Sequence, residues 1–221
     1  STQAKTLFPY TTLFRSNYLT RPPKRSDVLS VFAGLRPLAA PRSEGKKTKE
    51  ISRSHKLIRE KSGLITIIGG KWTTYRKMAQ DTLDLAIRHM HIPTKDCITE
   101  RYQIHGSRKN PDFSDPLYVY GTDADEIRNL VASSPAMAEK LHPDYAYTVG
   151  EVTWLVRNEM PRTLEDVLAR RLRILFLDAR AAMAMAPKVA GILATEWGKD
   201  ETWTSAQVKA FNEVASNYIL N

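Results

Sequence analysis

Residues 62–90 read "SGLITIIGGKWTTYRKMAQDTLDLAIRHM", and this stretch decides how the chain around it folds. The compact run Leu64–Ile68 is rich in β-branched residues, which predicts a buried strand. Gly69–Gly70 ends the run. Beyond Thr74 the apolar residues recur every three or four positions as far as Met90, which predicts an amphipathic helix. The stretch therefore predicts a strand, a glycine turn and a helix.

A glycine turn that leads into a helix suits an electron-rich ligand. Glycine leaves the backbone N–H groups unobstructed, and the helix N-terminus adds unpaired N–H groups and the positive end of a dipole. Lys71 adds a positive charge at the same place. The arrangement favours a phosphate or the N1–C2=O2 edge of a flavin, with a purely structural turn as the alternative. The spacing matches neither a Walker loop nor the dinucleotide fingerprint, because it lacks the four-residue spacer of the first and the third glycine of the second.

Outward from this stretch, the chain changes character on both sides. Residues 17–61 are irregular and interrupted by prolines, with short strands predicted at 28–32 and within 49–60. Residues 93–116 form a connector with one strand candidate at 97–104. Helices are predicted over 122–132, 145–160, 161–198 and 204–220, and Pro187 is expected to divide or kink the third of them. We expect an α+β fold with boundaries at 1–16, 17–92, 93–119 and 120–221.

Length and composition indicate an ordinary globular protein. The 221 residues permit one or two domains, and the 42% hydrophobic and 26% charged contents are typical of soluble proteins. No window of 18 apolar residues occurs, so the sequence predicts no segment that spans a bilayer. Cys97 is the single cysteine, which excludes an internal disulfide.

The positive charge is concentrated in one part of the chain. The net charge is +9, and residues 17–76 hold 14 Lys and Arg against 4 Asp and Glu. Such a segment either meets an anion, such as nucleic acid, a phosphorylated cofactor or substrate, or acidic lipid, or it is a solvated basic face. Arg36, held stiffly between Gly34 and Pro37, and Arg53 on a candidate strand could together clamp a phosphate. Ordinary surface ion pairs are the alternative.

The histidines give a weaker signal. His55 could act as a general base, but a lone histidine near cations is more often a hydrogen-bonding residue. His89 and His91 lack further ligands at the required spacing, so we expect no metal site there.

Residues 7–16, "LFPYTTLFRS", fit neither the helical nor the strand period. Back-translated, they resemble the reading of a common short-read sequencing adapter, with a strand that carries an edge proline as the alternative. We expect residues 6–16 to carry no evolved information and the natural sequence to begin upstream of them.

Four separated motifs carry a family resemblance. They are "GLRPL" at 34–38, "ISRSH" at 51–55, "LITIIGGKWTTYRKMAQ" at 64–80 and "VRNEMPRTLEDVLARRLRILFLDARAA" at 156–182. In this order they resemble the FAD-dependent glycerol-3-phosphate dehydrogenases, from about residue 17 to 221. The resemblance covers the family's C-terminal half and does not include its N-terminal GxGxxG unit.

This resemblance implies a function and a set of site residues. Such enzymes oxidise sn-glycerol 3-phosphate to dihydroxyacetone phosphate with FAD and pass the electrons to a membrane quinone, as peripheral proteins on the cytoplasmic face of the inner membrane. The family's motifs assign Arg36 and Arg53 to the substrate. They assign four residues to the flavin: Gly70, Lys71, Trp72 and Thr73. Many members have leucine at position 72, and the tail 120–221 resembles the family's helical cap domain after a partial FAD and substrate domain.

Two other functions stay open at this point. A related oxidase would pass its electrons to oxygen, and a basic domain could bind nucleic acid. Against nucleic acid, no aromatic residues interleave the Lys and Arg residues. The resemblance names no general base, and we expect this chain alone to be inactive.

Overall fold

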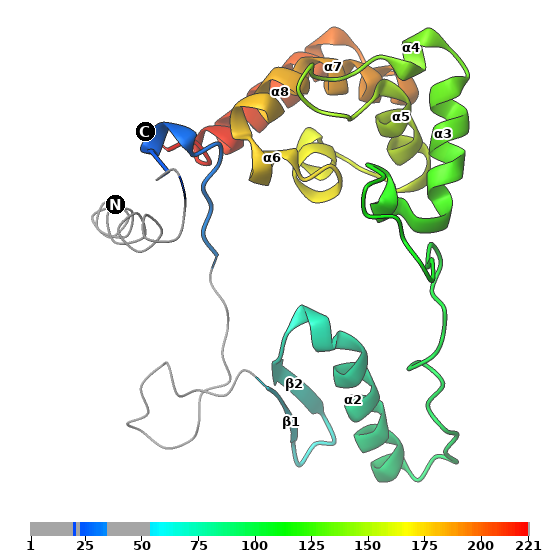
Figure 1. Ribbon diagram of the computed structural model, residues 1–221. Helices are drawn as coiled ribbons and strands as arrows, with labels where there is room; N and C mark the ends of the chain where they lie inside the picture. Colours follow the sequence, from blue (N-terminus) through cyan, green and yellow to red (C-terminus); the bar gives the residue numbers. More distant parts are fainter. Residues whose placement is uncertain (1–19, 21–22, 35–53, 221) are drawn as a thin grey trace. The chain divides into compact units, whose positions relative to one another are not determined.

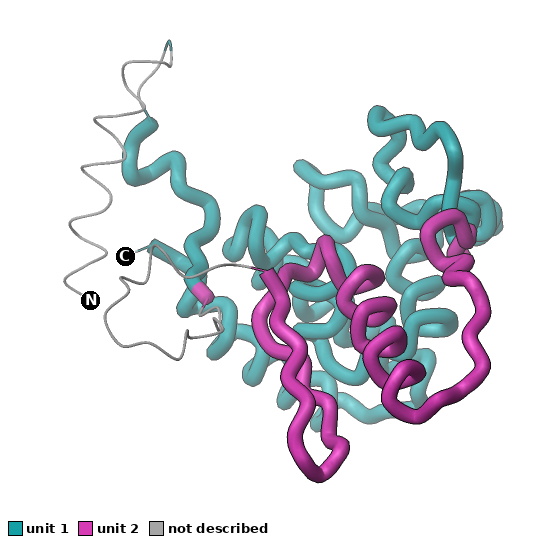
Figure 2. The backbone as a smooth tube through the Cα atoms, turned by 90° about the horizontal axis from the view of Figure 1, so that it is seen from below, with its two compact units in different colours: residues 1–33, 106–221 teal, residues 34–105 magenta. Residues whose placement is uncertain are grey.

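The computed structural model describes residue 20 and residues 23–34 and 54–220, which fall into two compact units (Figure 2). One unit comprises residues 34–105 and the other residues 1–33 and 106–221. The adapter-like segment 6–16 and the two arginines assigned to the substrate, Arg36 and Arg53, lie outside the described residues. The domain boundaries expected from the sequence stay a prediction.

The smaller unit contains the predicted strand, turn and helix (Figure 1). Strand β1, His55–Arg59, pairs antiparallel with β2, Ile65–Gly69, in a two-stranded sheet. A 3-10 turn, η3 (Trp72–Thr74), leads into helix α2 (Tyr75–Met90), which contacts β2. No residue of 54–105 is fully buried, so this unit encloses no core of its own in the part that the structure describes. The expectation that the run Leu64–Ile68 is a buried strand is therefore wrong in its burial: β2 forms, but each of its residues is only partly covered.

The strand expected over residues 97–104 is wrong. The structure shows turns and irregular backbone there. Ile98, Tyr102 and Ile104 are 72%, 67% and 63% exposed. An apolar alternation forms a strand only when a neighbouring strand takes its hydrogen bonds, and none lies beside this segment in the described residues.

The larger unit is helical and holds the core. Its described elements are η1 (Arg25–Asp27), η4 (Tyr118–Asp123), α3 (Ala124–Ala132), α4 (Pro135–Ala138), α5 (Val149–Asn158), the π-helical turn η5 (Asp166–Arg171), α6 (Ile174–Leu177), α7 (Ala179–Trp197) and α8 (Glu201–Ser216). Helices α5 and α8 both pack on α7 (Figure 1). Their apolar faces and that of α6 exclude water around residues such as Leu155, Leu175 and Met185, each with 0% exposure.

Several helix boundaries differ from the expectation, among them the start of α5 at Val149 instead of 145. Helix α7 continues through Pro187, and the long stretch 161–198 is divided instead at Arg173, which has a left-handed backbone, and at Asp178. The Asp178 carboxylate accepts a hydrogen bond from the amide of Ala181 at 3.0 Å, which caps α7 there. Helix α8 begins earlier than expected, because Asp200 caps it by accepting from the Trp203 amide at 2.8 Å.

The strand expected at 28–32 is also wrong, because this extended segment pairs with the ends of helices. Ala179 N donates to the carbonyl oxygen of Leu29 at 3.2 Å, and Val31 N donates to that of Tyr218 at 2.8 Å. Two of the segment's backbone groups are therefore satisfied without a sheet.

The described residues are thus mostly helical with one small sheet. None of the described helices is both long and apolar enough to cross a bilayer.

Candidate functional site

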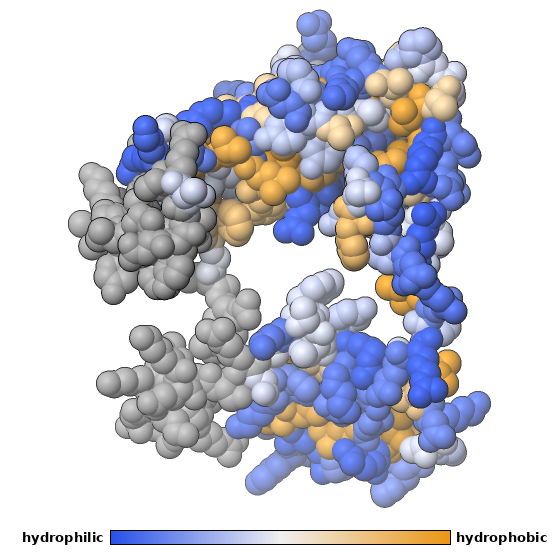
Figure 3. Space-filling model, viewed as in Figure 1, coloured by the Kyte–Doolittle hydropathy of each residue, from blue (hydrophilic) through white to orange (hydrophobic). Residues whose placement is uncertain are grey.

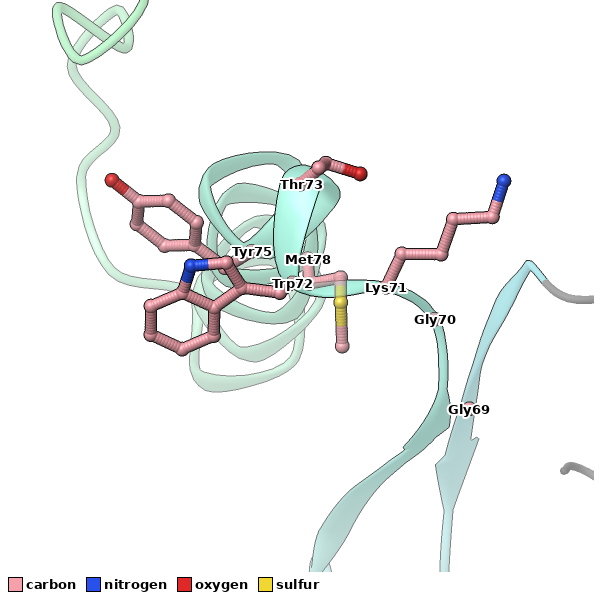
Figure 4. A pocket seen from close by; sticks show the side chains of 7 residues that line it. All are labelled: Gly69, Gly70, Lys71, Trp72, Thr73, Tyr75 and Met78. Carbon is pink, nitrogen blue, oxygen red and sulfur yellow. The ribbon is translucent and has the colours of Figure 1, made fainter. Parts of the chain in front are cut away.

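The glycine turn of the smaller unit opens a cavity of about 670 Å³ (Figure 4). Seven residues line it: Gly69, Gly70, Lys71, Trp72, Thr73, Tyr75 and Met78. All four residues that the sequence assigns to a cofactor are among them. The end of β2, the turn and the first two turns of the helical segment therefore bring these residues together.

Gly70 is a position in the turn at which a side chain would be strained. Its φ is +83°, in the region that glycine alone adopts readily. A Cβ atom on Gly70 would lie 2.5 Å from Sδ of Met78 and 3.2 Å from Cβ of His55. Glycine therefore allows the turn to pack closely against Met78 of α2 and His55 of β1.

The cavity has one cationic side and one aromatic side. Figure 4 shows Lys71 extending away from the turn in one direction, while the rings of Trp72 and Tyr75 lie together in the other direction. Met78 lies between Lys71 and the two rings. The two rings are stacked, with centroids 5.4 Å apart and planes at 25°. Trp72 is 85% exposed. Its large apolar ring therefore has room for a ligand or partner.

Thr74 stabilises the turn that carries the cavity residues. Its hydroxyl donates to the Lys71 carbonyl oxygen at 2.9 Å, and its amide donates to the same oxygen at 3.0 Å. These bonds fix the 3-10 turn at the start of α2, where unpaired N–H groups collect. The arrangement can hold a planar aromatic ligand with an electron-rich edge.

A charged group ties the strand to the helix beside the cavity. His55 Nε2 lies 2.9 Å from Oδ2 of Asp81, and Lys77 Nζ lies 2.9 Å from the other oxygen of the same carboxylate. The hydrogen bond from Lys77, with that from His55, holds the pKa of Asp81 below its ordinary value despite partial desolvation. His55 is thus a hydrogen-bonding residue in this structure, which agrees with the simpler interpretation of the sequence.

Sequence reasoning missed Tyr75 and Met78 as cavity residues. The sequence pattern places both only in the apolar stripe of α2. Their spacing of three, directly after the turn, puts them on one face at the start of the helix, and that spacing is the signal that could have found them. The described residues contain no cluster of three or more His, Cys, Asp or Glu side chains that could hold a metal ion.

Comparison with known proteins decides the family. The sequence model of one family, described as the C-terminal domain of alpha-glycerophosphate oxidase, matches residues 64–204. The chain belongs to this family. The matched region of the alpha-glycerophosphate oxidase C-terminal domain begins at the strand before the glycine turn and runs into α8.

Curated relatives agree with this membership. The chain is 32% identical over 248 residues to "Glycerol-3-phosphate dehydrogenase SDP6, mitochondrial" of Arabidopsis thaliana, covering 91% of the chain and 39% of the relative. It is 36% identical over 221 residues to "Probable glycerol-3-phosphate dehydrogenase, mitochondrial" of Caenorhabditis elegans, covering 89% and 29%. The chain therefore spans about a third of the length of these relatives. The resemblance to glycerol-3-phosphate dehydrogenases that the sequence motifs indicated is confirmed.

Proposed function

We propose that this chain supplies part of the site of a flavoprotein that oxidises sn-glycerol 3-phosphate to dihydroxyacetone phosphate. The observation that carries the proposal is the cavity at the glycine turn, because it gathers Gly70, Lys71, Trp72 and Thr73. Family membership and the names of the relatives support the substrate and the oxidoreductase class.

The residues of the cavity fit a flavin. Gly70 takes a positive φ and lets the turn pack closely against Met78, which lines the same cavity. Lys71 and the N–H groups at the start of the 3-10 turn would hold an electron-rich edge, and the Trp72 ring offers an aromatic face. When bound, FAD accepts hydride from the alcohol carbon. The work of these chain residues is to orient the ring and to stabilise negative charge at its edge.

The substrate contacts rest on the sequence. We propose that Arg36 and Arg53 grip the phosphate through bidentate hydrogen bonds, which a planar guanidinium group supplies and an ammonium group does not. Residues 17–76 contain 14 Lys and Arg residues but only 4 Asp and Glu residues, and this positive charge supports an anionic substrate and cofactor for this part of the chain.

The electron acceptor and location complete the proposal. We propose a membrane quinone as acceptor and peripheral attachment to the inner membrane face, with the cytoplasmic side as the expected one. The relatives are named mitochondrial. An oxidase that uses oxygen is the second candidate, because the matching family model is described by the name of an oxidase.

Flavin titration of the complete chain tests the cavity. We expect weak, saturable quenching of FAD fluorescence, and we expect Gly70→Ala to weaken it strongly, because the new Cβ would displace Met78 and strain the turn that shapes the cavity. Gly63→Ala is the matched control, because Gly63 also has a positive φ (+91°) but a Cβ atom there would meet no other atom within 4 Å. Equal quenching by both variants would remove the glycine turn from the flavin site.

A chimaera tests the reaction. Residues 17–221 would replace the matching third of the Caenorhabditis elegans relative, and dye reduction with glycerol 3-phosphate would be followed. Lys71→Ala should lower turnover, whereas Lys61→Ala, which removes an exposed lysine from the hairpin turn, should not. A folded, flavin-loaded chimaera that oxidises other alcohols but not glycerol 3-phosphate would overturn the substrate assignment.

A further inference from the structure

A second cavity, of about 580 Å³, lies wholly within the helical unit. Four aromatic residues contribute to its lining: Tyr118, Tyr120, Tyr147 and Phe176. They come from the segment before α3, the segment before α5, and α6. Figure 3 shows hydrophobic side chains gathered on the face of the helical unit that carries α6.

The same cavity contains a buried carboxylate. Glu151, the third residue of α5, is only 4% exposed and lines this cavity. Its Oε1 accepts a hydrogen bond from the Tyr120 hydroxyl at 2.6 Å. The Thr148 amide provides a further neutral partner. In the part of the chain that the structure describes, no Lys or Arg nitrogen lies within 4.0 Å of this carboxylate.

The two arginines of the lining do not neutralise Glu151. The guanidinium group of Arg171 is engaged elsewhere, with Nε 3.1 Å from Oε2 of Glu159 and Nη1 donating to the Asp166 carbonyl oxygen at 2.8 Å. Arg173 is an exposed residue at the start of α6.

Burial therefore raises the pKa of Glu151, and the hydrogen bonds from Tyr120 and Thr148 only partly oppose this effect. The other titratable groups that line this cavity are Tyr118, Tyr120, Tyr147, Arg171 and Arg173. A carboxylate that is buried without a cation loses hydration that its neutral partners do not fully replace.

We propose that this cavity binds a small organic cation, whose ammonium group pairs with Glu151 between the aromatic rings. Aromatic faces attract ammonium groups through their quadrupole, and an adjacent carboxylate adds the opposite charge. The volume lies within the range of small-molecule sites. An ammonium ligand could be a free amine or the head group of a lipid, and both share this chemistry. The proposal is independent of the flavin site, because none of its residues lines the cavity at the glycine turn.

Calorimetric titration of the complete chain with choline at pH 8 tests the proposal. We expect saturable binding in the millimolar range, which corresponds to about 4 kcal/mol. Glu151→Gln keeps the shape and removes the charge, and we expect it to weaken binding about tenfold or more, which corresponds to about 1.4 kcal/mol. Glu213→Gln, on the surface of α8, is the matched control and should bind like the unmodified chain.

A second variant covers the case in which Glu151→Gln fails to fold. Tyr118 is 43% exposed, so Tyr118→Ala should fold and still lose the cation–π contact. Vesicles of phosphatidylcholine and of phosphatidylglycerol distinguish the sources. If the chain binds only the phosphatidylcholine vesicles and choline competes with this binding, the ligand is a lipid head group. If the chain binds choline but neither kind of vesicle, the ligand is a free amine. No saturable choline binding, or equal affinity in all variants, would overturn the proposal.

Discussion

His55 Nε2 lies 2.9 Å from Oδ2 of Asp81, so one hydrogen bond joins β1 to α2 across the glycine turn. Residues 54–105 include no fully buried side chain. Few apolar contacts therefore help this hydrogen bond to hold β1 against α2. Lys77, one turn earlier on α2, contacts the second oxygen of the same carboxylate. The position of the turn therefore depends on a polar contact.

Asp81→Ala should loosen the hairpin from the helix. Removing the carboxylate leaves His55 without its partner and Lys77 without its ion pair. Hydrogen–deuterium exchange should become faster over 55–59 and 65–69, while exchange in the helical unit stays unchanged. Asp84→Ala is the control, because Asp84 lies on the same helix and its carboxylate makes no hydrogen bond or ion pair with the residues that the structure describes. Equal acceleration by both variants would show that the tie is unimportant.

Glu151 should make the helical unit less stable as the pH rises. Its pKa in the folded protein is raised above the ordinary value of 4.5 by burial. Below about that pH the carboxyl is protonated in the folded and unfolded states alike. As the pH rises from the unfolded-state pKa to the folded-state pKa, the unfolded state has already lost a proton that the folded state retains, so stability is lost.

Glu151→Gln removes this titration. In urea unfolding followed by circular dichroism, the stability of the variant relative to the unmodified chain should increase with pH above 4.5. Glu213→Gln should show a constant difference. A difference for Glu151→Gln that decreases with rising pH would mean that an ion pair stabilises the carboxylate in solution.

Gly121 should resist substitution more than any neighbouring residue in its turn. Its φ is +56° with ψ −119°, and a Cβ there would lie 1.6 Å from the carbonyl oxygen of Gly106. Gly121→Ala must therefore move backbone as well as adopt a strained conformation, at a cost of about 1–3 kcal/mol. Gly191→Ala, within α7 and with nothing within 4 Å, should be neutral or stabilising by about 1 kcal/mol. Thermal unfolding of both variants checks the contrast.

The parts of the fold that sequence predicted well are those with their own periodicity. The run Leu64–Ile68 and the stripe from Tyr75 to Met90 carry strong local patterns, and both elements form, although the strand is only partly covered and not buried as expected. The residues predicted to contact the flavin line one cavity, because they lie on a strand end, a tight turn and a helix start that are consecutive in the chain.

The errors arose where distant residues decide the outcome. Segment 28–32 looks like a strand, but its backbone partners are Ala179 and Tyr218, about 150 and 190 residues away by chain order. Segment 97–104 alternates like a strand and has no partner strand in the described residues. The cavity with the cation-free Glu151 could not be found from sequence either, because its aromatic lining comes from three separate segments.

The chain by itself should not turn over glycerol 3-phosphate. The flavin partners that the structure offers are a helix start and Lys71, which together contribute about 1–2 kcal/mol. Micromolar binding requires about 8 kcal/mol. The aromatic face of Trp72 adds about 1 kcal/mol, which does not close this gap. We therefore expect the chain to bind FAD weakly and not to form a stoichiometric complex with it.

The smaller unit should also associate with itself at high concentration. Every residue of β2 is only partly covered, and Leu64, Leu83 and Trp72 are 63%, 60% and 85% exposed. In the described residues this unit is a two-stranded sheet with one helix and no fully buried side chain, which is marginal alone. A strand edge left open in such a sheet can pair with another chain. The measurement is gel filtration of the purified chain across a range of concentrations, followed by FAD addition and dye reduction with glycerol 3-phosphate. A monomer that binds one FAD tightly and reduces the dye would show that residues 1–221 contain the whole site, contrary to this prediction.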